Sequence, residues 1–283
     1  PIGIVGLISA WNYPLNVAFR KVAPALVAGN CAILKPSEIA GLSCMFLGKL
    51  AKDVGIPEGV FSVVTGDRET GAALVASPSV SMVSFTGSSL TGSKIMEASA
   101  PKLSQVALEL GGKSAMVVFE DTDIERAVEA TIKGCLTNGG QICTAHTRLI
   151  VQEGIKDDLL KKLKNVLEKI PYCSDPITER ERGDRAWETG MTDVIQPVVS
   201  ESQHEKVLGF LNEAKASGIE IYTGGGVPDP TDVKNSSGYF IQPTILTNVP
   251  RDSDAWQKEI FGPVLSVRSF SAEADAIDEA NST

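Results

Sequence analysis

A cysteine in the segment NGGQICTAHTR is the residue with the clearest chemical potential in this sequence. Cys143 follows a glycine pair and precedes the apolar run TRLIV, so we expect it in a loop between a helix and a strand, where reactive groups are often presented. Two other readings stay open at this point. Cys143 could be a small buried thiol that only packs, or it could pair with His146, three residues on, as in a Cys-His hydrolase.

A carboxylate is the second candidate for chemistry. Glu109 ends the apolar run QVALE just before Gly111 and Gly112, so we expect it at the end of a strand. A carboxylate at a sheet edge beside a cleft can act as a general base. The alternative is an ion-paired or helix-capping glutamate, and the residue alone does not decide between the two.

Two glycine-rich turns could bind phosphate. TGDRETG and SFTGSSLTG each follow an expected strand and open an expected helix, where backbone N–H groups and the helix dipole favour an anion. Neither matches the GxGxxG fingerprint, and such a turn is often only a tight turn. In KPSE, Lys35 and Glu38 follow the strand-like run CAILK, and this pair suits ribose hydroxyls.

Composition excludes several classes of function. The 283 residues include 26 Lys+Arg against 35 Asp+Glu, and the net charge of -9 argues against a nucleic-acid partner. The apolar runs are too short to span a membrane. Five cysteines without a CxxC pair favour a reducing compartment, either the cytoplasm or an organelle interior. Because the first residue is Pro1 rather than Met, we expect a section of a longer polypeptide, with any targeting segment out of view.

Strand-like runs alternate with helical segments along the whole chain, which predicts α/β units built on parallel sheets. We expect a domain boundary near Gly111 and Gly112, giving domains of residues 1–111 and 112–283. The stretch 171–197 is polar and lacks periodicity, which predicts a surface excursion. The expected helices are 15–28, 41–54, 70–76, 91–98, 124–136, 156–170 and 203–216.

Six motifs occur along the chain, namely WNYP (11–14), KPSE (35–38), FTGS (85–88), LELGGK (108–113), NGGQIC (138–143) and EIFGPV (259–264). In their order and spacing they resemble the motifs of the aldehyde dehydrogenase superfamily, and the resemblance covers almost the whole chain. Within the superfamily the sequence looks most like betaine-aldehyde and aminoaldehyde dehydrogenases. The resemblance implies an open, parallel Rossmann-like cofactor domain followed by an α/β catalytic domain, both incomplete relative to the family.

The resemblance also implies roles for particular residues. Cys143 would be the nucleophile, Asn12 would bind the oxyanion, and Glu109 would activate water, so that an aldehyde is oxidised to a carboxylic acid through a thioester. NAD would be the cofactor, with no metal, and the complete protein would be a homo-oligomer, a dimer or tetramer. Tyr13 and Trp256 would line the substrate site. The implied cofactor-binding residues are Trp11, Lys35, Glu38, Gly87, Ser88, Glu259 and Phe261.

The sequence departs from the family pattern at several positions. Arg20 and Thr137 stand where plant aminoaldehyde enzymes usually carry tryptophans, and an arginine would repel a quaternary ammonium that an aromatic face would attract. Betaine aldehyde is therefore disfavoured as the substrate. Residues 172–196 form a longer loop than expected, and Gln196 replaces an expected glycine. A catalytically silent homologue that binds nucleotide is the alternative to an active enzyme.

Overall fold

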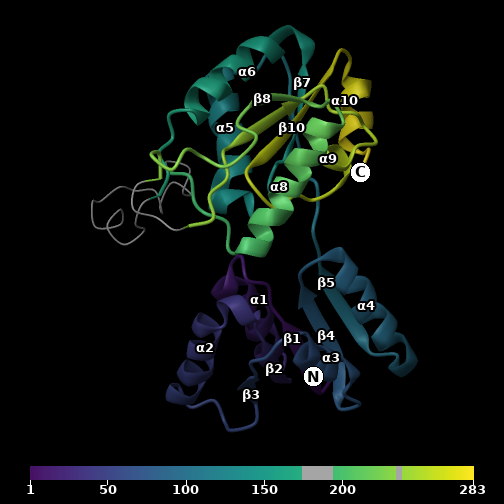
Figure 1. The fold of residues 1–283 in the computed structure, drawn as a ribbon. Coiled ribbons are helices and arrows are strands. Elements are labelled where there is room, and N and C mark those ends of the chain that lie inside the picture. The colour runs from purple at the N-terminus through teal and green to yellow at the C-terminus, as the bar shows by residue number, and fades with distance from the viewer. Residues whose placement is uncertain (174–193, 234–237) are drawn as a thin grey trace. The chain divides into compact units, whose positions relative to one another are not determined.

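The computed structural model describes residues 1–173, 194–233 and 238–283, which form two compact units, Pro1–Gly111 and Gly112–Thr283 (Figure 1). Each unit has its own sheet, with helices packed against it. In the described part of the chain, no helix combines the length and the apolar character needed to cross a membrane. The described portion of the expected surface excursion is tied at its ends, where Tyr172 bridges to Ile195; residues 174–193 lie outside the described residues.

The first unit contains a five-stranded sheet in the order β3-β2-β1-β4-β5, and every pair of neighbours is parallel. This confirms the expected parallel α/β organisation, and the helices begin and end within two residues of the expected bounds. The strands are β1 (Ile4–Ile8), β2 (Cys31–Lys35), β3 (Phe61–Val63), β4 (Val80–Thr86) and β5 (Gln105–Glu109); the helices are α1 (Pro14–Val27), α2 (Leu42–Asp53), α3 (Arg68–Ala76) and α4 (Ser89–Ser99).

The strand order explains where a ligand site should lie in this unit. The chain winds from β1 through β2 to β3 on one side and then returns to place β4 on the other side of β1. In open α/β sheets the crevice at such a reversal, outside the carboxyl ends of the strands, is the usual ligand site. The sheet is buried on both faces, because Val5 and Leu7 pack in one apolar cluster and Val83 and Phe85 in another.

The second unit has a sheet in the order β6-β7-β10-β9-β8, which is parallel except for β8 against β9. The strand β9 begins at Thr244, directly after Pro243, which has no N–H to donate to a ladder. The strands are β6 (Ala115–Val118), β7 (Arg148–Gln152), β8 (Glu220–Thr223), β9 (Thr244–Thr247) and β10 (Val264–Phe270); the helices include α5 (Ile124–Leu136), α6 (Glu153–Leu167), α8 (Glu201–Ala216), α9 (Asp254–Gln257) and α10 (Glu273–Ala280).

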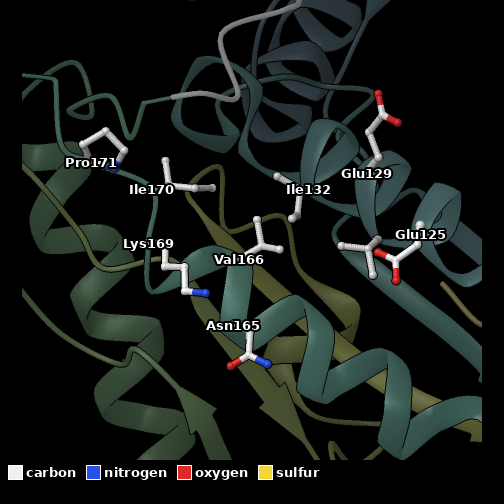
Figure 2. A pocket seen from close by; sticks show the side chains of 9 residues that line it. Glu125, Glu129, Ile132, Asn165, Val166, Lys169, Ile170 and Pro171 are labelled. Atoms are coloured by element: carbon white, nitrogen blue, oxygen red, sulfur yellow. The ribbon is translucent and has the colours of Figure 1, made fainter.

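A groove of about 520 Å³ lies between α5 and α6 (Figure 2). Glu129 of α5 and Lys169, which follows α6, are among the residues that line it. None of the residues that the sequence motifs singled out lines this groove, so it is separate from the predicted chemistry. Its lining residues are Glu125, Val128, Glu129, Ile132, Asn165, Val166, Lys169, Ile170 and Pro171.

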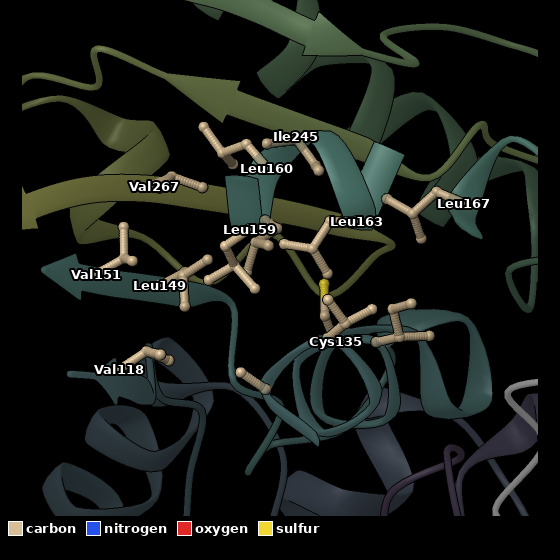
Figure 3. Packing of buried hydrophobic residues seen from close by; sticks show 14 of the residues in the cluster. Val118, Cys135, Leu149, Val151, Leu159, Leu160, Leu163, Leu167, Ile245 and Val267 are labelled. Carbon is tan, nitrogen blue, oxygen red and sulfur yellow. The ribbon is translucent and has the colours of Figure 1, made fainter. Parts of the chain in front are cut away.

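The core of the second unit joins α5 and α6 to the sheet (Figure 3). Leu159 and Leu163 of α6 are fully buried beside Leu149 of β7, while Cys135 of α5 points into the same cluster. Burying side chains of this size stabilises the fold by roughly 1.5–3 kcal/mol each. This packing fixes α5 and β7, which are the two elements on either side of the Cys143 loop.

A buried guanidinium organises the polar side of the second unit. Arg148 of β7 is 2% exposed, and its Nε donates to the Lys113 carbonyl at 2.7 Å. Its terminal nitrogens donate to the carbonyls of Glu279 and Ala280 at the end of α10, at 2.8 and 2.7 Å. Helix C-termini leave carbonyls without intrahelical partners, and Arg148 supplies donors to them. Its guanidinium also lies 5.1 Å from the centre of the Trp256 ring.

We predict that Arg148→Met destabilises the protein by about 3 kcal/mol or more, because it removes the charged donor from three carbonyls, two of them in buried hydrogen bonds. Chemical denaturation monitored by circular dichroism measures this change. Lys49→Met is the matched control, since Lys49 forms an exposed i,i+4 pair with Asp53 and its loss should leave the unfolding midpoint unchanged. Equal midpoints for Arg148→Met and wild type would show that the guanidinium does not hold these segments together.

Candidate active site

A pocket of about 590 Å³ lies at the carboxyl edge of the first unit's sheet. It collects the predicted cofactor residues of this unit, namely Trp11, Lys35, Glu38, Gly87 and Ser88. The motifs that carry these residues are far apart in the sequence, but each follows a strand of the same parallel sheet. Parallel strands end at one edge, so the tertiary structure brings the motifs together.

Lys35 and Glu38 form an ion pair, with 3.4 Å between Nζ and Oε2. The Lys35 side chain is 7% exposed, whereas that of Glu38 is 58% exposed. The buried ammonium therefore sits at the end of β2 with a carboxylate above it that remains open to hydrogen-bond donors. Such a pair can bind the hydroxyls of a ribose from both sides, since the ammonium donates and the carboxylate accepts.

Two helix N-termini border the same pocket. Ser88 is the N-cap of α4, where its hydroxyl accepts from the Thr91 N–H at 3.3 Å. Asp67 caps α3 and accepts from the Glu69 N–H at 2.9 Å. Both helix dipoles favour an anion at this end of the pocket.

The pocket also contains charged residues that the motif analysis did not assign. Arg68 begins α3 and Lys94 lies on α4, and both line the cavity. Arg68 lies inside the TGDRETG motif, so a search of the glycine turns for cations would have found it. The apolar wall is formed by Ile8, Val75, Phe85, Ile95 and Ala98.

Glu109 ends β5, and its carbonyl accepts from the Gly87 N–H at 3.1 Å. Its side chain is exposed. Asn12 and Tyr13 follow β1 and precede α1, with Asn12 partly exposed and Tyr13 37% exposed. All three lie at or beyond the carboxyl ends of their strands, which is the edge that holds the pocket.

A buried lysine near Glu109 escaped the sequence analysis. Lys21 of α1 is 8% exposed, and its Nζ donates to the Ser84 hydroxyl at 2.9 Å. Burial lowers the pKa of Lys21 to about 8, and the charge of Glu109 opposes this shift. A lysine in the middle of a helical apolar run carries no motif signal, so only the fold identifies it.

Cys143 is exposed, and it is the only one of the five cysteines that is. It follows the short helix η3 (Thr137–Gly140), in which Asn138 has a φ of 55° and Gly140 a φ of 74°. Burial raises the pKa of Cys44 and raises that of Cys135 to about 12. Because Cys143 is exposed, the interpretation that it is a small buried thiol that only packs is wrong. The buried thiols are those of Cys44, Cys135 and Cys173.

Close backbone packing in the second unit brings three motifs together around Cys143. A Cβ on Gly140 would lie 2.2 Å from the Gly262 carbonyl oxygen, so only glycine fits there. A Cβ on Gly112 would lie 3.4 Å from the Cys143 carbonyl oxygen. The Cys143 loop is thus in contact with both the LELGGK and the EIFGPV segments.

Side-chain amides hold the loops in this arrangement. Gln141 is buried, and its Nε2 donates to the Asn138 carbonyl at 2.8 Å while its Oε1 accepts from the Val199 N–H at 2.9 Å. Gln203 of α8 donates to the Phe261 carbonyl at 2.8 Å. Phe261 has a φ of 61°, which is rare for a residue with a Cβ, and this hydrogen bond helps to hold that conformation.

Glu259 lies in the same cluster and is partly buried. Its Oε1 accepts from the Gly112 N–H at 3.3 Å. Burial raises the pKa of Glu259, while the Gly112 N–H and the charges of Lys206 and Lys113 oppose that shift. A carboxylate in this position can accept hydrogen bonds from a bound hydroxyl-bearing ligand.

The structure does not support two of the expectations drawn from the sequence, namely Trp256 at the substrate site and His146 as a partner of Cys143. Trp256 is fully buried, with its Nε1 bonded to the Ser282 hydroxyl at 2.9 Å, so its ring has no surface to offer a substrate. His146 packs against α5, since a Cβ on Gly134 would lie 2.6 Å from its Nδ1. Across the described residues no hydrogen bond joins His146 to Cys143, and the Cys-His hydrolase hypothesis loses its support.

Three of the positions that depart from the family pattern, Arg20, Thr137 and Gln196, are at least partly exposed. Arg20 is exposed on α1. Thr137 is partly exposed, and its hydroxyl donates to the Lys133 carbonyl at 2.6 Å. The Gln196 carbonyl oxygen lies 3.3 Å from where a Cβ on Gly139 would be, so the end of the long loop lies against the Cys143 loop.

Comparison with known proteins supports the interpretation of the motifs. The aldehyde dehydrogenase family matches residues 1–283. Aminoaldehyde dehydrogenase 2, peroxisomal, from Pisum sativum is 49% identical over 100% of this chain and 53% of its own length. Betaine aldehyde dehydrogenase, chloroplastic, from Beta vulgaris is 44% identical with the same coverage. The chain spans about half the length of the curated relatives it matches.

Solved structures show the same relationship at the level of the fold. The crystal structure of a betaine aldehyde dehydrogenase from Staphylococcus aureus in complex with NAD+ matches with a TM-score of 0.90 and 36% identity, covering 100% of this chain and 53% of that one. An aldehyde dehydrogenase from Bartonella henselae matches with a TM-score of 0.88 and 37% identity, covering 100% of this chain and 56% of that one. On the fold, the motifs and the match over its whole length, the chain belongs to the aldehyde dehydrogenase family.

Proposed function

We propose that the protein containing this chain oxidises an aldehyde to a carboxylic acid with NAD, through a thioester on Cys143. The observation that carries the proposal is the exposed Cys143 in a loop packed against the LELGGK and EIFGPV segments. Residues 1–111 serve as part of the cofactor domain and residues 112–283 as part of the catalytic domain.

Cys143 begins the reaction as a thiolate. Its sulfur attacks the carbonyl carbon of the aldehyde and forms a thiohemiacetal, and the electron pair of the C=O bond moves to oxygen. The side-chain amide of Asn12 and the backbone N–H of Cys143 donate to that oxyanion. Loss of hydride from the same carbon then converts the adduct to a thioester.

The pocket of the first unit fits the adenosine diphosphate part of NAD. Lys35 and Glu38 suit the ribose hydroxyls, Gly87 and Ser88 stand at the helix N-terminus that favours phosphate, and Trp11 lines the wall. Glu259 and Phe261 of the second unit are assigned to the nicotinamide ribose. When bound, NAD supplies the hydride acceptor.

Glu109 completes the turnover. Its carboxylate takes a proton from a water molecule, the water oxygen attacks the thioester carbon, and the C–S bond breaks to release the carboxylic acid and regenerate the thiolate. The protein's own residues thus provide nucleophile, oxyanion donors and base.

The names of the relatives and the departures from the family pattern guide our assignment of the substrate, and the cysteines guide that of the compartment. Two relatives are named aminoaldehyde and betaine aldehyde dehydrogenases, and we assign an aminoaldehyde-type substrate. Arg20, which is exposed, disfavours the quaternary ammonium of betaine aldehyde. Tyr13 remains assigned to the substrate site. Five free cysteines fit a reducing compartment, and we assign the protein to a homo-oligomer.

The central test of this function is aldehyde-dependent NADH formation by the full-length protein, followed by absorbance with a panel of aldehydes. Cys143→Ala is the control, because it removes the sulfur that forms the adduct while shortening the side chain by one atom. NADH formation that persists in Cys143→Ala would refute the proposed mechanism.

Cys143 should be alkylated first among the cysteines. It is exposed, whereas Cys44, Cys135 and Cys173 are buried and Cys31 is half-buried. Timed iodoacetamide labelling with peptide mass mapping measures the five rates, and Cys135 should be among the slowest, since burial raises its pKa to about 12. If Cys31 reacts as fast as Cys143, the nucleophile has been assigned to the wrong residue.

NAD should be preferred over NADP. The Glu38 carboxylate would repel a 2′-phosphate, although Lys35 at 3.4 Å offsets part of this repulsion. We expect kcat/KM to favour NAD by about tenfold or more, equivalent to about 1.4 kcal/mol. Glu38→Gln should raise kcat/KM for NADP and so reduce the ratio of kcat/KM for NAD to kcat/KM for NADP. If this ratio stays unchanged in the variant, the assignment of Glu38 to the ribose is contradicted.

Glu109 and Glu259 are assigned to different steps, so their neutral variants should fail differently. Glu109→Gln removes the base for thioester hydrolysis, and a rapid burst of NADH should survive while steady turnover stalls. Glu259→Gln loosens the nicotinamide ribose and slows hydride transfer itself, so its burst should be slow or absent. Stopped-flow measurements separate the two, and identical traces for both variants would rule out this division of roles.

A further inference from the structure

Arg68 is a cation without a partner in the pocket of the first unit. It lines this pocket together with Lys35 and Glu38, and its side chain is exposed. Among the residues that the structure describes, Arg68 takes part in none of the ion pairs. A guanidinium presents five N–H donors in a planar fork, so an unpaired one in a cavity is suited to an anionic group of a ligand.

The other charged groups of the pocket have identifiable roles. Lys35 and Glu38 are paired with each other at 3.4 Å. Asp67 caps the N-terminus of α3, where the helix dipole offsets its charge. Lys94 of α4 is the remaining cation that lines the pocket. With Arg68, the pocket therefore has three cations against two carboxylates, and it favours an anionic ligand.

Strand pairing places Arg68 on the ribose side of the pocket. β2, which ends at Lys35, pairs with β3, and the Val64 N–H directly after β3 donates to the Leu34 carbonyl at 2.9 Å. The chain then turns and begins α3 with Arg68. Lys94 belongs instead to α4, which follows β4 on the other side of β1. Of these two cations, Arg68 is the one that comes from the strand next to the Lys35–Glu38 pair.

The turn that carries Arg68 is held tightly and leaves open space beside the guanidinium. Gly66 has a φ of 148°, and a Cβ at this position would overlap the Thr70 side chain, so the turn requires glycine. Gly71 lines the pocket one helical turn after Arg68, and a Cβ on Gly71 would meet nothing within 4 Å. The surface of α3 next to Arg68 is therefore open to a group of the ligand.

We propose that Arg68 is a specificity-determining residue that donates to a phosphate on the 2′-oxygen of the adenosine ribose, so that the pocket accepts NADP as well as NAD. Arginine can bind a phosphate through two N–H groups at once. Glu38 repels the same phosphate, and Arg68 reduces this penalty, so the preference for NAD is smaller than Glu38 alone would make it. The inference rests on the assignment of this pocket to the cofactor, which is part of the proposed function.

Calorimetric binding of two nucleotides to the full-length protein tests this contact without any need for activity. The probes are adenosine 5′-monophosphate and adenosine 2′,5′-bisphosphate, which differ only in the 2′-phosphate. Arg68→Met should weaken binding of the bisphosphate by about tenfold, as expected for loss of a charge-assisted hydrogen bond, and that of the monophosphate by less than about twofold. Arg68→Lys should restore part of the loss, because it keeps the charge but not the planar fork.

Arg126→Met is the matched control. Arg126 is exposed in the first turn of α5, a helix with an aspartate N-cap like that of α3, but it does not line the pocket. Its substitution should leave both dissociation constants unchanged. Lys94→Met tests the position of the phosphate, since Lys94 lies on the α4 side. It should affect the two nucleotides alike, and a selective loss of the bisphosphate in Lys94→Met, with none in Arg68→Met, would overturn the inference.

The Glu38→Gln background distinguishes a direct contact with the phosphate from screening of Glu38. If Arg68 acts on the phosphate itself, Arg68→Met should still cause about a tenfold loss of bisphosphate affinity in this background, whereas mere screening would leave no effect. A selective loss that persists supports the inference, even if the full-length protein forms no NADH and the proposed function fails. Equal effects on the two nucleotides, no effect, or an effect that disappears in Glu38→Gln would overturn the inference, even in a protein that is active with NAD.

Discussion

The second unit depends on the buried guanidinium of Arg148. It binds the Lys113 carbonyl, the last carbonyls of α10 and the face of Trp256, so it joins β7 to the segment before β6 and to the end of the chain described. The position of Gly112 follows from this, and with it the N–H that holds Glu259. A fully buried arginine is stable only when its donors are satisfied, and this one finds carbonyls that helix and loop ends leave open.

Close packing at glycines fixes the backbone around Gly112 and Cys143. The absence of a Cβ at Gly140 lets the Cys143 loop approach the Gly262 carbonyl, and Gly112 lies against the Cys143 backbone from the other side. Backbone contacts of this kind leave less freedom than contacts between long side chains. Cys143 is exposed, yet its main chain is held by rigid neighbours, and this combination suits a nucleophile whose N–H is also assigned to oxyanion binding.

Each unit buries a lysine. Lys21 and Lys113 are both largely removed from water, and burial lowers the pKa of each to about 8. Lys21 is bonded to Ser84, whereas Lys113 has no such partner among the described residues. A fold selected for stability alone would replace the second lysine with an apolar residue. Functional sites are where such unfavourable burial is expected.

The sequence by itself determined the alternation of strands and helices, the bounds of most helices and the motifs that place Cys143, Glu109, Lys35 and Ser88 at element ends. These depend on local periodicity and on turn residues, which can be read along the chain. It also indicated the family, because six motifs in order are more specific than any single one.

Only the tertiary structure decided which of those residues meet and which are buried. Trp256 reads as an accessible aromatic in the sequence, but packing against Arg148 encloses it completely. Nothing in the local sequence indicated that Lys21 and Lys113 are buried, and their burial arises from strands and helices that are distant in sequence. Local pattern reports the polarity of a side chain and its place on an element, whereas solvent access and charge environment are set by long-range packing.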